Sequence, residues 1–305
     1  MTTIAAPAAT APAPARRRRG SLGRDRRWAL RWSYFFLVLF VIFFLLPPVY
    51  MLITSLKTSA EISAASNPWW VFSPTLGNYV ELLSSQQYLT FFRNSALVSL
   101  IVVVTTMLIS VPAAFALSRM RFWGSATLAS GVFRTYLIPE TLLFIPLFKM
   151  FTVVTDWTGI ELINRWWVLL IVYPTLTVPF CTWVMIGYFA SIPRELDEAA
   201  LIDGANYRQV LLRVFIPVAL PGLIAATIFA FTVSWAQFLY PLVFTTSTDQ
   251  LVLPVGIITS LIKGDVFNWG QIMTGALLGA APPLIIYAFL MDYYIAGLTA
   301  GATKG

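Results

Sequence analysis

The stretch SIPRELDEAALIDGANYRQVLLRVFIPVALPG, residues 191–222, is a polar interruption between two long hydrophobic runs. Ser191 and Pro193 are typical of helix starts, and the acidic side chains that follow suit the positive end of a helix dipole. Asp203-Gly204 predicts a sharp turn, because glycine adopts a left-handed backbone at little cost. A second amphipathic helix is expected over residues 207–215. Residues 190–217 are therefore predicted to form a helix, a turn and a second helix that lie along a membrane surface.

The hydrophobic runs on either side explain the composition of the whole chain. Of its 305 residues, 58% are hydrophobic and only 11% are charged, and the mean hydropathy is +0.78. A soluble domain carries roughly a quarter charged residues. A soluble protein with a large core would need apolar runs of strand or core-helix length only. Several runs here reach the ~20 residues that cross a hydrocarbon core, so we predict an all-α integral membrane protein.

Six stretches are long and apolar enough to be transmembrane helices. They cover about residues 34–53, 95–117, 127–150, 167–189, 218–238 and 272–295. The third is the least regular, because it contains Arg134, Pro139, Glu140 and Pro146. This count makes residues 34–295 a single transmembrane domain.

Positive charge is distributed unevenly over the segments between these spans. With the N-terminus in the cytoplasm, fourteen of the 20 Lys and Arg residues lie on the cytoplasmic side and four lie outside. Because cytoplasmic loops are enriched in Lys and Arg, both termini are expected in the cytoplasm. Residues 1–33, rich in Ala, Pro and Arg, predict a disordered basic tail, and residues 296–305 a cytoplasmic C-terminal tail. The first apolar run is longer than a signal-peptide core, so an uncleaved anchor is expected.

Composition also excludes several classes of function. With one cysteine, Cys181, and no histidine, neither a disulfide framework nor a metal site built on these residues is expected. The sequence has no G-x-S-x-G motif and no catalytic cluster, so an enzyme is not expected. It also has no Gly-rich loop ending in Gly-Lys-Ser/Thr, so the chain is not expected to bind ATP. Its basic residues lie beside apolar runs, which disfavours nucleic acid as a partner.

From the residues alone, residues 190–217 have two interpretations. They form either a helix resting on lipid headgroups or a knob that inserts into another protein. Glu195, Asp197 and Glu198 make one face acidic, which disfavours anionic lipid. Ala199 and Ala200 lie beside them and permit the close approach of a partner. The acidic face and the adjacent alanines together favour docking on a protein.

Several short elements then resemble a known family. The spacing and position of four of them resemble the EAA motif of binding-protein-dependent ABC importers: Glu198-Ala199-Ala200, Gly204, Ile216-Pro217 and Leu220-Pro221. Others resemble the maltose-transporter-type permease branch of that family: the final GLTAGATKG, Asn94-Ser95, Trp235 with Phe238, Leu253-Pro254-Val255-Gly256 and Trp269-Gly270. The resemblance covers nearly everything from about residue 34 onward.

The resemblance implies a coupling mechanism. Residues 190–217 would be a coupling helix seated in a cleft of a separate ATP-binding subunit, which would bind ATP and Mg. Glu198 would form an ion pair there, and Ala199 and Ala200 would allow close approach. The turn at Asp203 and Gly204, the pair Ile216-Pro217, and the tail residues Thr303 and Lys304 would complete the contact.

The resemblance also implies an assembly in the bacterial inner membrane. Two copies of the ATP-binding subunit, a second, homologous permease and an extracytoplasmic solute-binding protein are the expected partners. The binding protein would meet the external segment at about residues 239–271. The expected cargo is a sugar or oligosaccharide.

The solute path requires polar groups at membrane depth. Glu140 is expected ~20 Å along the third span, where a carboxylate marks either a solute path or a structural pair with a neighbouring helix. Trp235 and Tyr240 could stack on a sugar while Gln237 binds its hydroxyls, although an interfacial aromatic belt has the same composition. The family usually has Asn-Glu where this chain has Ala236-Gln237, so this site is not carried over from it.

Two alternative functions stay open. A permease for another polar solute, such as a glycerol phosphate or a peptide, is the nearest. Arg134 is the one basic residue well inside a span, which argues against a phosphate cargo. An ion-coupled secondary transporter would need several titratable groups along its path, whereas this chain offers one central Glu and no His.

Overall fold

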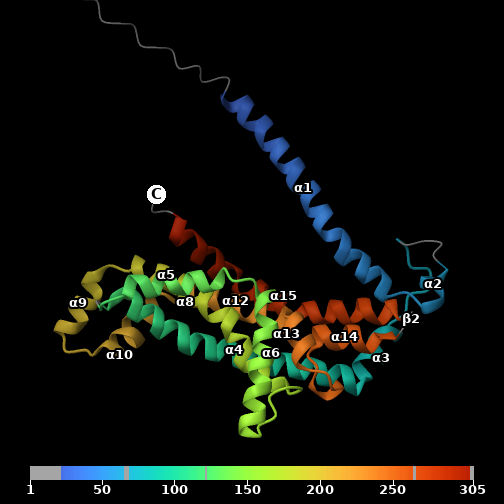
Figure 1. Ribbon diagram of the computed structural model, residues 1–305. Helices are drawn as coiled ribbons and strands as arrows, with labels where there is room; N and C mark the ends of the chain where they lie inside the picture. The colour runs from blue at the N-terminus through green and yellow to red at the C-terminus, as the bar shows by residue number, and fades with distance from the viewer. Residues whose placement is uncertain (1–21, 65–68, 121, 264–265, 303–305) are drawn as a thin grey trace, which may run out of the picture. The chain divides into compact units, whose positions relative to one another are not determined.

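The computed structural model describes residues 22–64, 69–120, 122–263 and 266–302 (Figure 1). The chain divides into two compact units, Met1–Tyr50 and Met51–Gly305. The long and medium helices are α1 (Leu22–Ser55), α3 (Gly77–Ser84), α4 (Gln86–Arg119), α5 (Ser125–Tyr136), α6 (Glu140–Thr158), α8 (Pro174–Ser191), α9 (Arg194–Ile202), α12 (Leu220–Ala236), α13 (Leu239–Phe244), α14 (Leu253–Leu261) and α15 (Trp269–Ala302).

Shorter elements connect these helices. They are α2 (Ser59–Ser63), η1 (Trp166–Val168), α7 (Leu169–Val172), α10 (Tyr207–Val210), the π-helical turn η2 (Leu211–Phe215), α11 (Ile216–Val218) and η3 (Thr248–Gln250). Within the described residues, the only strands are β1 (Ile262–Lys263) and β2 (Val266–Phe267), an antiparallel pair in which Ile262 lies opposite Phe267. The all-α prediction is therefore confirmed, apart from this small hairpin.

The first unit contains most of α1. Every side chain from Arg26 to Tyr50 is exposed, as expected for an apolar helix whose surroundings are lipid. The helix begins at Leu22, twelve residues before the predicted start of the first span. The Leu, Arg and Ala residues between positions 22 and 33 are good helix formers, so the helix extends through them. Most of the predicted basic tail, residues 1–21, lies outside the described residues.

The second unit is built around helices α4, α8 and α12, which pack on one another. Helix α4 packs along α8 and α12, α12 also packs on α15, and α5 packs on α8 (Figure 1). Gly222 allows α12 to approach α8 closely, because a Cβ at this position would lie 2.4 Å from Cγ of Tyr188. Helices α9 and α10 lie at one end of this unit, and α3 and α14 lie at the other (Figure 1).

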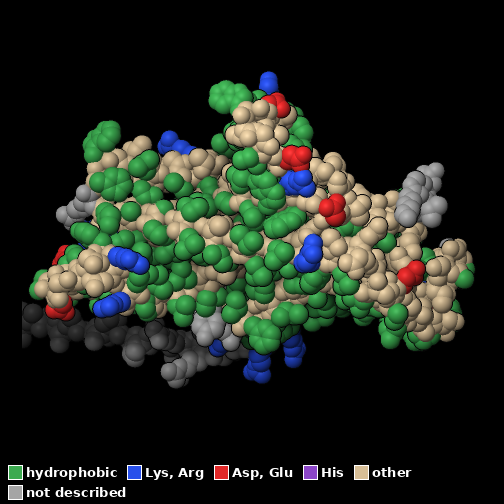
Figure 2. Space-filling model, turned by 90° about the horizontal axis from the view of Figure 1, so that it is seen from below, with side chains coloured by type: hydrophobic (Ala, Val, Ile, Leu, Met, Phe, Trp, Pro, Cys, Tyr) green, Lys and Arg blue, Asp and Glu red, His purple; other side chains and the backbone are tan. Residues whose placement is uncertain are grey.

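Five helical segments within the described residues are long and apolar enough to cross a membrane. They are Arg26–Ser55, Gln86–Arg119, Glu140–Thr158, Trp166–Ser191 and Trp269–Met291. A sixth is counted if Tyr207–Val218 and Leu220–Ala236, which meet at 83°, are taken together as one broken span. Large apolar side chains stay exposed on these helices, and Figure 2 shows them across much of one face, with charged side chains scattered among them. This surface suits a lipid environment.

The prediction that the third span is one continuous helix is wrong. The sequence predicted one helix over residues 127–150, but α5 ends at Tyr136 and a new helix, α6, begins at Glu140. Pro139 explains the break, because proline lacks an N–H donor and disfavours helical backbone in the residue before it. Glu140 therefore opens a helix instead of lying in the middle of one.

Candidate functional site

Helix α9 forms the first arm of the predicted helix–turn–helix. Glu195 and Asp197 lie in its first turn, where negative charge is stabilised by the N-terminal end of the helix dipole. None of its nine residues is buried. Glu198 and Ala199 are exposed, and Ile202 keeps 85% of its surface accessible. The helix thus presents acidic, small and apolar side chains outward together.

The turn after α9 has the geometry predicted for Gly204. Its φ is +86°, in the left-handed region that favours glycine. The N–H of Ala205 donates to the carbonyl of Ala200 at 3.0 Å, and the N–H of Gly204 donates to that of Leu201 at 3.1 Å. These two bonds form a Schellman motif, which satisfies carbonyls at the end of the helix. Local hydrogen bonds therefore fix the shape of the turn.

The second arm begins with a capping box. The side chain of Asn206 accepts from the N–H of Gln209, and the side chain of Gln209 accepts from the N–H of Asn206, both at 2.9 Å. Ile216 and Pro217 follow in α11, with Pro217 in the first turn, where its missing N–H costs nothing. The chain then turns by 83° into α12.

The inner side of this loop packs on a hydrophobic cluster. Ala200, Ala205 and Ile216 are partly buried against it. Its buried members include Phe115, Phe189 and Phe215. Residues 190–217, which we call the elbow, thus have a packed inner side and an exposed outer side. They contain the coupling residues predicted from the sequence: Glu198, Ala199, Ala200, Asp203, Gly204, Ile216 and Pro217. Thr303 and Lys304 lie outside the described residues.

The predicted path residues separate into two groups. The structure brings Glu140, Gln237 and Tyr240 together: the Gln237 amide donates to Oε2 of Glu140 at 3.0 Å, and the Tyr240 hydroxyl donates to the Glu140 carbonyl at 3.3 Å. Oε1 of Gln237 also accepts from the N–H groups of Phe238 and Leu239. Burial and the nearby Glu140 carboxylate raise the pKa of Tyr240 to about 12, so its hydroxyl stays protonated and donates.

A cavity of 620 Å³ adjoins this contact. Glu140 is exposed at its edge, and Gln237 is 8% exposed. The other lining residues are apolar or hydroxyl-bearing: Thr135, Tyr136, Leu137, Ile138, Pro139, Leu143, Thr175, Leu176, Phe229, Val233 and Ala236. One carboxylate among apolar, hydroxyl and amide groups suits a neutral, hydroxyl-rich molecule.

Trp235 lies away from this cavity. Its indole N–H donates to the Gly279 carbonyl at 2.8 Å, and its ring stacks on Phe231 and meets the edge of Phe92. It is 5% exposed and packs α12 against α15. Tyr240 has no exposed surface, and neither ring is among the residues that line the cavity beside Glu140. The two aromatic side chains thus have structural contacts in this conformation.

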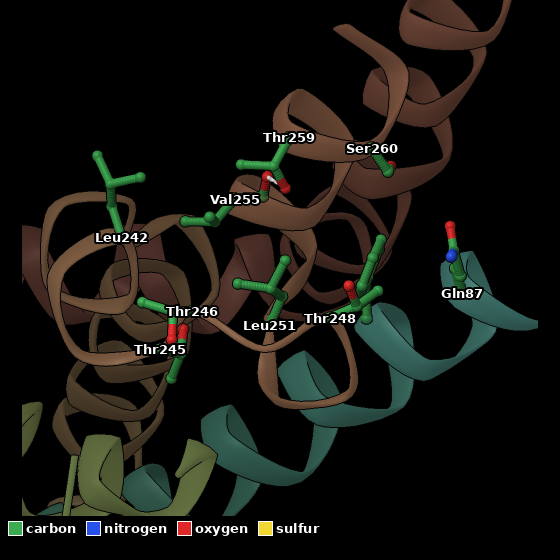
Figure 3. Close-up of a pocket in the computed structure, with 10 residues that line it drawn as sticks. Gln87, Leu242, Thr245, Thr246, Thr248, Leu251, Val255, Thr259 and Ser260 are labelled. Carbon is green, nitrogen blue, oxygen red and sulfur yellow. Dashed lines mark hydrogen bonds between the residues drawn. The ribbon is translucent and has the colours of Figure 1, made fainter. Parts of the chain in front are cut away.

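A second cavity of 410 Å³ lies between α13, α14 and the start of α4 (Figure 3). It falls within the external segment predicted at residues 239–271. Figure 3 shows Thr245 and Thr246 near Leu242, Thr259 and Ser260 on α14, and Gln87 on α4. The hydroxyls of Thr245, Thr259 and Ser260 already donate to backbone carbonyls. No charged residue lines it.

Sequence reasoning missed one residue at the elbow. In the sequence, Arg119 is only one of the fourteen basic residues counted on the cytoplasmic side. In the structure its side chain is 4% exposed and forms an ion pair with Asp197 of α9 at 3.4 Å. The pair is 78 positions apart in the sequence, so no local pattern could predict it.

Comparison with known proteins agrees with this architecture. Residues 89–299 match the family described as binding-protein-dependent transport system inner membrane component. A sulfoquinovosyl glycerol transport system permease of Agrobacterium fabrum is 36% identical over 262 residues, 86% of this chain and 89% of that protein.

Two further relatives have similar coverage. An inner membrane ABC transporter permease of Escherichia coli is 33% identical over 271 residues, 88% of this chain and 94% of the relative. A trehalose/maltose transport system permease of Thermococcus litoralis is 31% identical over 271 residues, with the same coverage of both chains.

A solved structure has the same fold. A chain of a bacterial ABC transporter involved in the import of the acidic polysaccharide alginate superimposes with a TM-score of 0.76, covering 93% of this chain and all of that one at 22% identity. The family match spans most of the chain, and the relatives above exceed 30% identity over most of their length. This multi-pass membrane protein therefore belongs to the inner membrane components of binding-protein-dependent transport systems, the permease subunits of ABC importers, whose ATPase is a separate chain.

Proposed function

We propose that this permease forms the path for a sugar or oligosaccharide and is driven by a separate ATPase that grips residues 190–217. The observation that carries the proposal is the elbow: α9 ends in a hydrogen-bonded C-terminal cap, yet none of its residues is buried. A capped helix that leaves acidic, small and apolar side chains exposed side by side fits a cleft on another protein better than an anionic lipid surface.

In this proposal each residue of the elbow has a task. Glu198 forms an ion pair with the ATPase, and Ala199 and Ala200 let its surface approach closely. Asp203 and Gly204 hold the turn, and Ile216-Pro217 carries the motion of the elbow into α12. Thr303 and Lys304 add a second contact from the C-terminal tail.

The assembly follows from the same proposal. Two ATP-binding subunits, which hold ATP and Mg, act on this chain and on a second, homologous permease. A solute-binding protein delivers the cargo to the external segment, residues 239–271. Both termini lie in the cytoplasm, as the distribution of Lys and Arg predicts.

The cargo class is supported by two relatives and by one cavity. The relatives are permeases for a sulfoquinovosyl glycerol and for trehalose and maltose. The cavity beside Glu140 and Gln237 offers an amide, hydroxyls and apolar side chains. We propose that sugar hydroxyls exchange for the Glu140–Gln237 hydrogen bond when the path opens.

Crosslinking tests the docking. Cys181 is the only cysteine in the chain and is buried, so an Ala199→Cys variant carries one accessible thiol. In the assembled transporter we expect this thiol to crosslink to the ATPase. A Trp157→Cys variant, whose position is 88% exposed near the end of α6 and outside residues 190–217, is the matched control and should not crosslink. Labelling of Ala199→Cys by lipid-phase reagents alone, without a crosslink to the ATPase, would contradict the proposed docking.

Uptake tests the cargo. The complex in proteoliposomes, with its binding protein, should import members of a panel of mono- and oligosaccharides in an ATP-dependent manner. Peptides and glycerol phosphates in the same assay represent the nearest alternatives. Import of one of these without any sugar import, or import without the ATPase, would contradict the proposal.

A further inference from the structure

We infer that Arg119 is a positioning residue that locks the elbow to the ends of α4 and α8, so that these helices move with α9. The inference rests on the proposed coupling role of residues 190–217. It concerns a residue outside the EAA-like stretch and far from it in the sequence.

The first set of contacts joins α4 to α8. Arg119 is the last residue of α4, and its Nη2 donates to the backbone carbonyls of Phe189 and Ile192. Phe189 lies in the last turn of α8 and Ile192 is its C-cap. Carbonyls at a helix end lack partners within the helix, and a cation there also interacts favourably with the dipole. Arg119 therefore caps α8 from the neighbouring helix.

The second contact joins this cap to the elbow. Nη1 of Arg119 lies 3.4 Å from Oδ1 of Asp197, whose side chain is 18% exposed. Because α9 has no buried residue, its attachment depends on few contacts. The ion pair is one of them, and the partly buried Ala200 and Ala205 supply others. Asp197 thus links α9 to the same guanidinium that holds α4 and α8.

The third contact extends the lock to the segment before the 83° bend. The guanidinium carbon of Arg119 lies 4.8 Å from the ring centroid of Phe215. Phe215 ends the π-helical turn and is fully buried, with its ring edge-to-face against Phe115 and Phe189. Such a contact is a cation–π interaction, and π-helical turns often mark functional positions.

One side chain of α4 thereby contacts three further elements, α8, α9 and η2. Arginine suits this place because its planar group offers donors in several directions and a face for an aromatic ring. Lysine has a compact charge and a different reach, so it would retain only some of these contacts. A push on α9 would be transmitted to α4 and α8 through Arg119 instead of being lost in local bending.

The test separates coupling from assembly. Arg119→Gln, Arg119→Lys and Asp197→Asn are made in the full complex, with Arg165→Gln as a control at an exposed, ion-paired arginine outside residues 190–217. For each we measure the amount of assembled complex, the Ala199→Cys crosslink to the ATPase, and the solute imported per ATP hydrolysed. We expect Arg119→Gln to lower this ratio at least ~10-fold and Asp197→Asn ~3-fold, with the crosslink retained. Arg119→Lys should lie between wild type and Arg119→Gln.

Asp197→Asn decides the outcome even if Arg119→Gln does not assemble, because it removes the link to α9 and leaves both carbonyl contacts of Arg119. A wild-type import ratio in Asp197→Asn would overturn the inference. A lowered ratio with an intact crosslink and an unaffected control supports it. Loss of the crosslink in the wild-type background would instead refute the proposed docking, so the two failures are distinguishable.

Discussion

Two polar regions of this hydrophobic chain are built in opposite ways. The elbow around Gly204 is held by hydrogen bonds between residues no more than five positions apart. The contact of Glu140 with Gln237 and Tyr240 joins residues 97 and 100 positions apart. The turn of the elbow therefore has a locally determined shape, although Arg119 also ties α9 to α4 and α8, whereas the Glu140 contact depends on the arrangement of α6 against α12 and α13. A segment with local hydrogen bonds suits contact with a partner that moves it, and a contact between distant helices suits a path that opens and closes.

Of the changes that test this comparison, Glu198→Lys is expected to have the largest effect. We expect Glu198→Lys to leave membrane insertion intact but to lower solute import at least ~10-fold, because it reverses a charge proposed to pair with the ATPase. Import and insertion are measured in vesicles. Glu161→Lys, an equal change at an exposed glutamate outside the elbow, is the control. Normal solute-stimulated import by Glu198→Lys would contradict the proposed role of Glu198 in coupling.

The next largest effect is expected at Gly204. A Cβ there meets no atom within 4 Å, so the strain of a substitution comes from the φ of +86° alone. Left-handed backbone costs a non-glycine residue about 1–2 kcal/mol, and a β-branched side chain more. Gly204→Val should lower import more than Gly204→Asn, since asparagine tolerates this conformation.

Gly187 provides the matched control for that series. It also has open space around its Cβ, but it lies within α8 with ordinary helical backbone. Gly187→Val should therefore retain import. Equal import by Gly204→Val and Gly204→Asn would show that the turn geometry does not matter for coupling.

A smaller effect is expected in the path. Glu140→Gln removes the charge from the hydrogen bond with Gln237 and should raise the KM for uptake about 5-fold. The Ala199→Cys crosslink should be unchanged, because the elbow does not depend on this contact. Asp156→Asn, on the same helix, is the control. An unchanged KM together with reduced thermal stability would assign Glu140 a structural pairing only.

The smallest effect is expected at Trp235. Trp235→Phe loses the hydrogen bond to the Gly279 carbonyl and should lower stability by about 1 kcal/mol. The KM for uptake should stay at the wild-type value, because the ring packs between α12 and α15. Thermal unfolding and uptake kinetics measure the two quantities. A raised KM would instead favour the sugar stacking that the sequence suggested.

Much of the architecture was predictable because its causes are local. Apolar runs of bilayer length predicted the spans, and Gly204 predicted the turn that the structure contains. The prediction for the third span failed because it kept Pro139 as an irregularity within one helix, whereas the backbone ends α5 before it and starts α6 after it. No hydropathy average distinguishes these outcomes, since the surrounding residues stay apolar in both.

The sequence by itself determined an all-helical membrane chain, the shape of its elbow and the family resemblance, since periodicity, capping and glycine conformation act over a few residues. Only the tertiary structure decided that Arg119 contacts Asp197 and that Gln237 contacts Glu140. It also decided that Trp235 lies away from the Glu140–Gln237 contact. These contacts depend on how α4, α6, α8, α12 and α15 pack. Such packing is selected by the fit of whole helix surfaces, which no short stretch of sequence encodes.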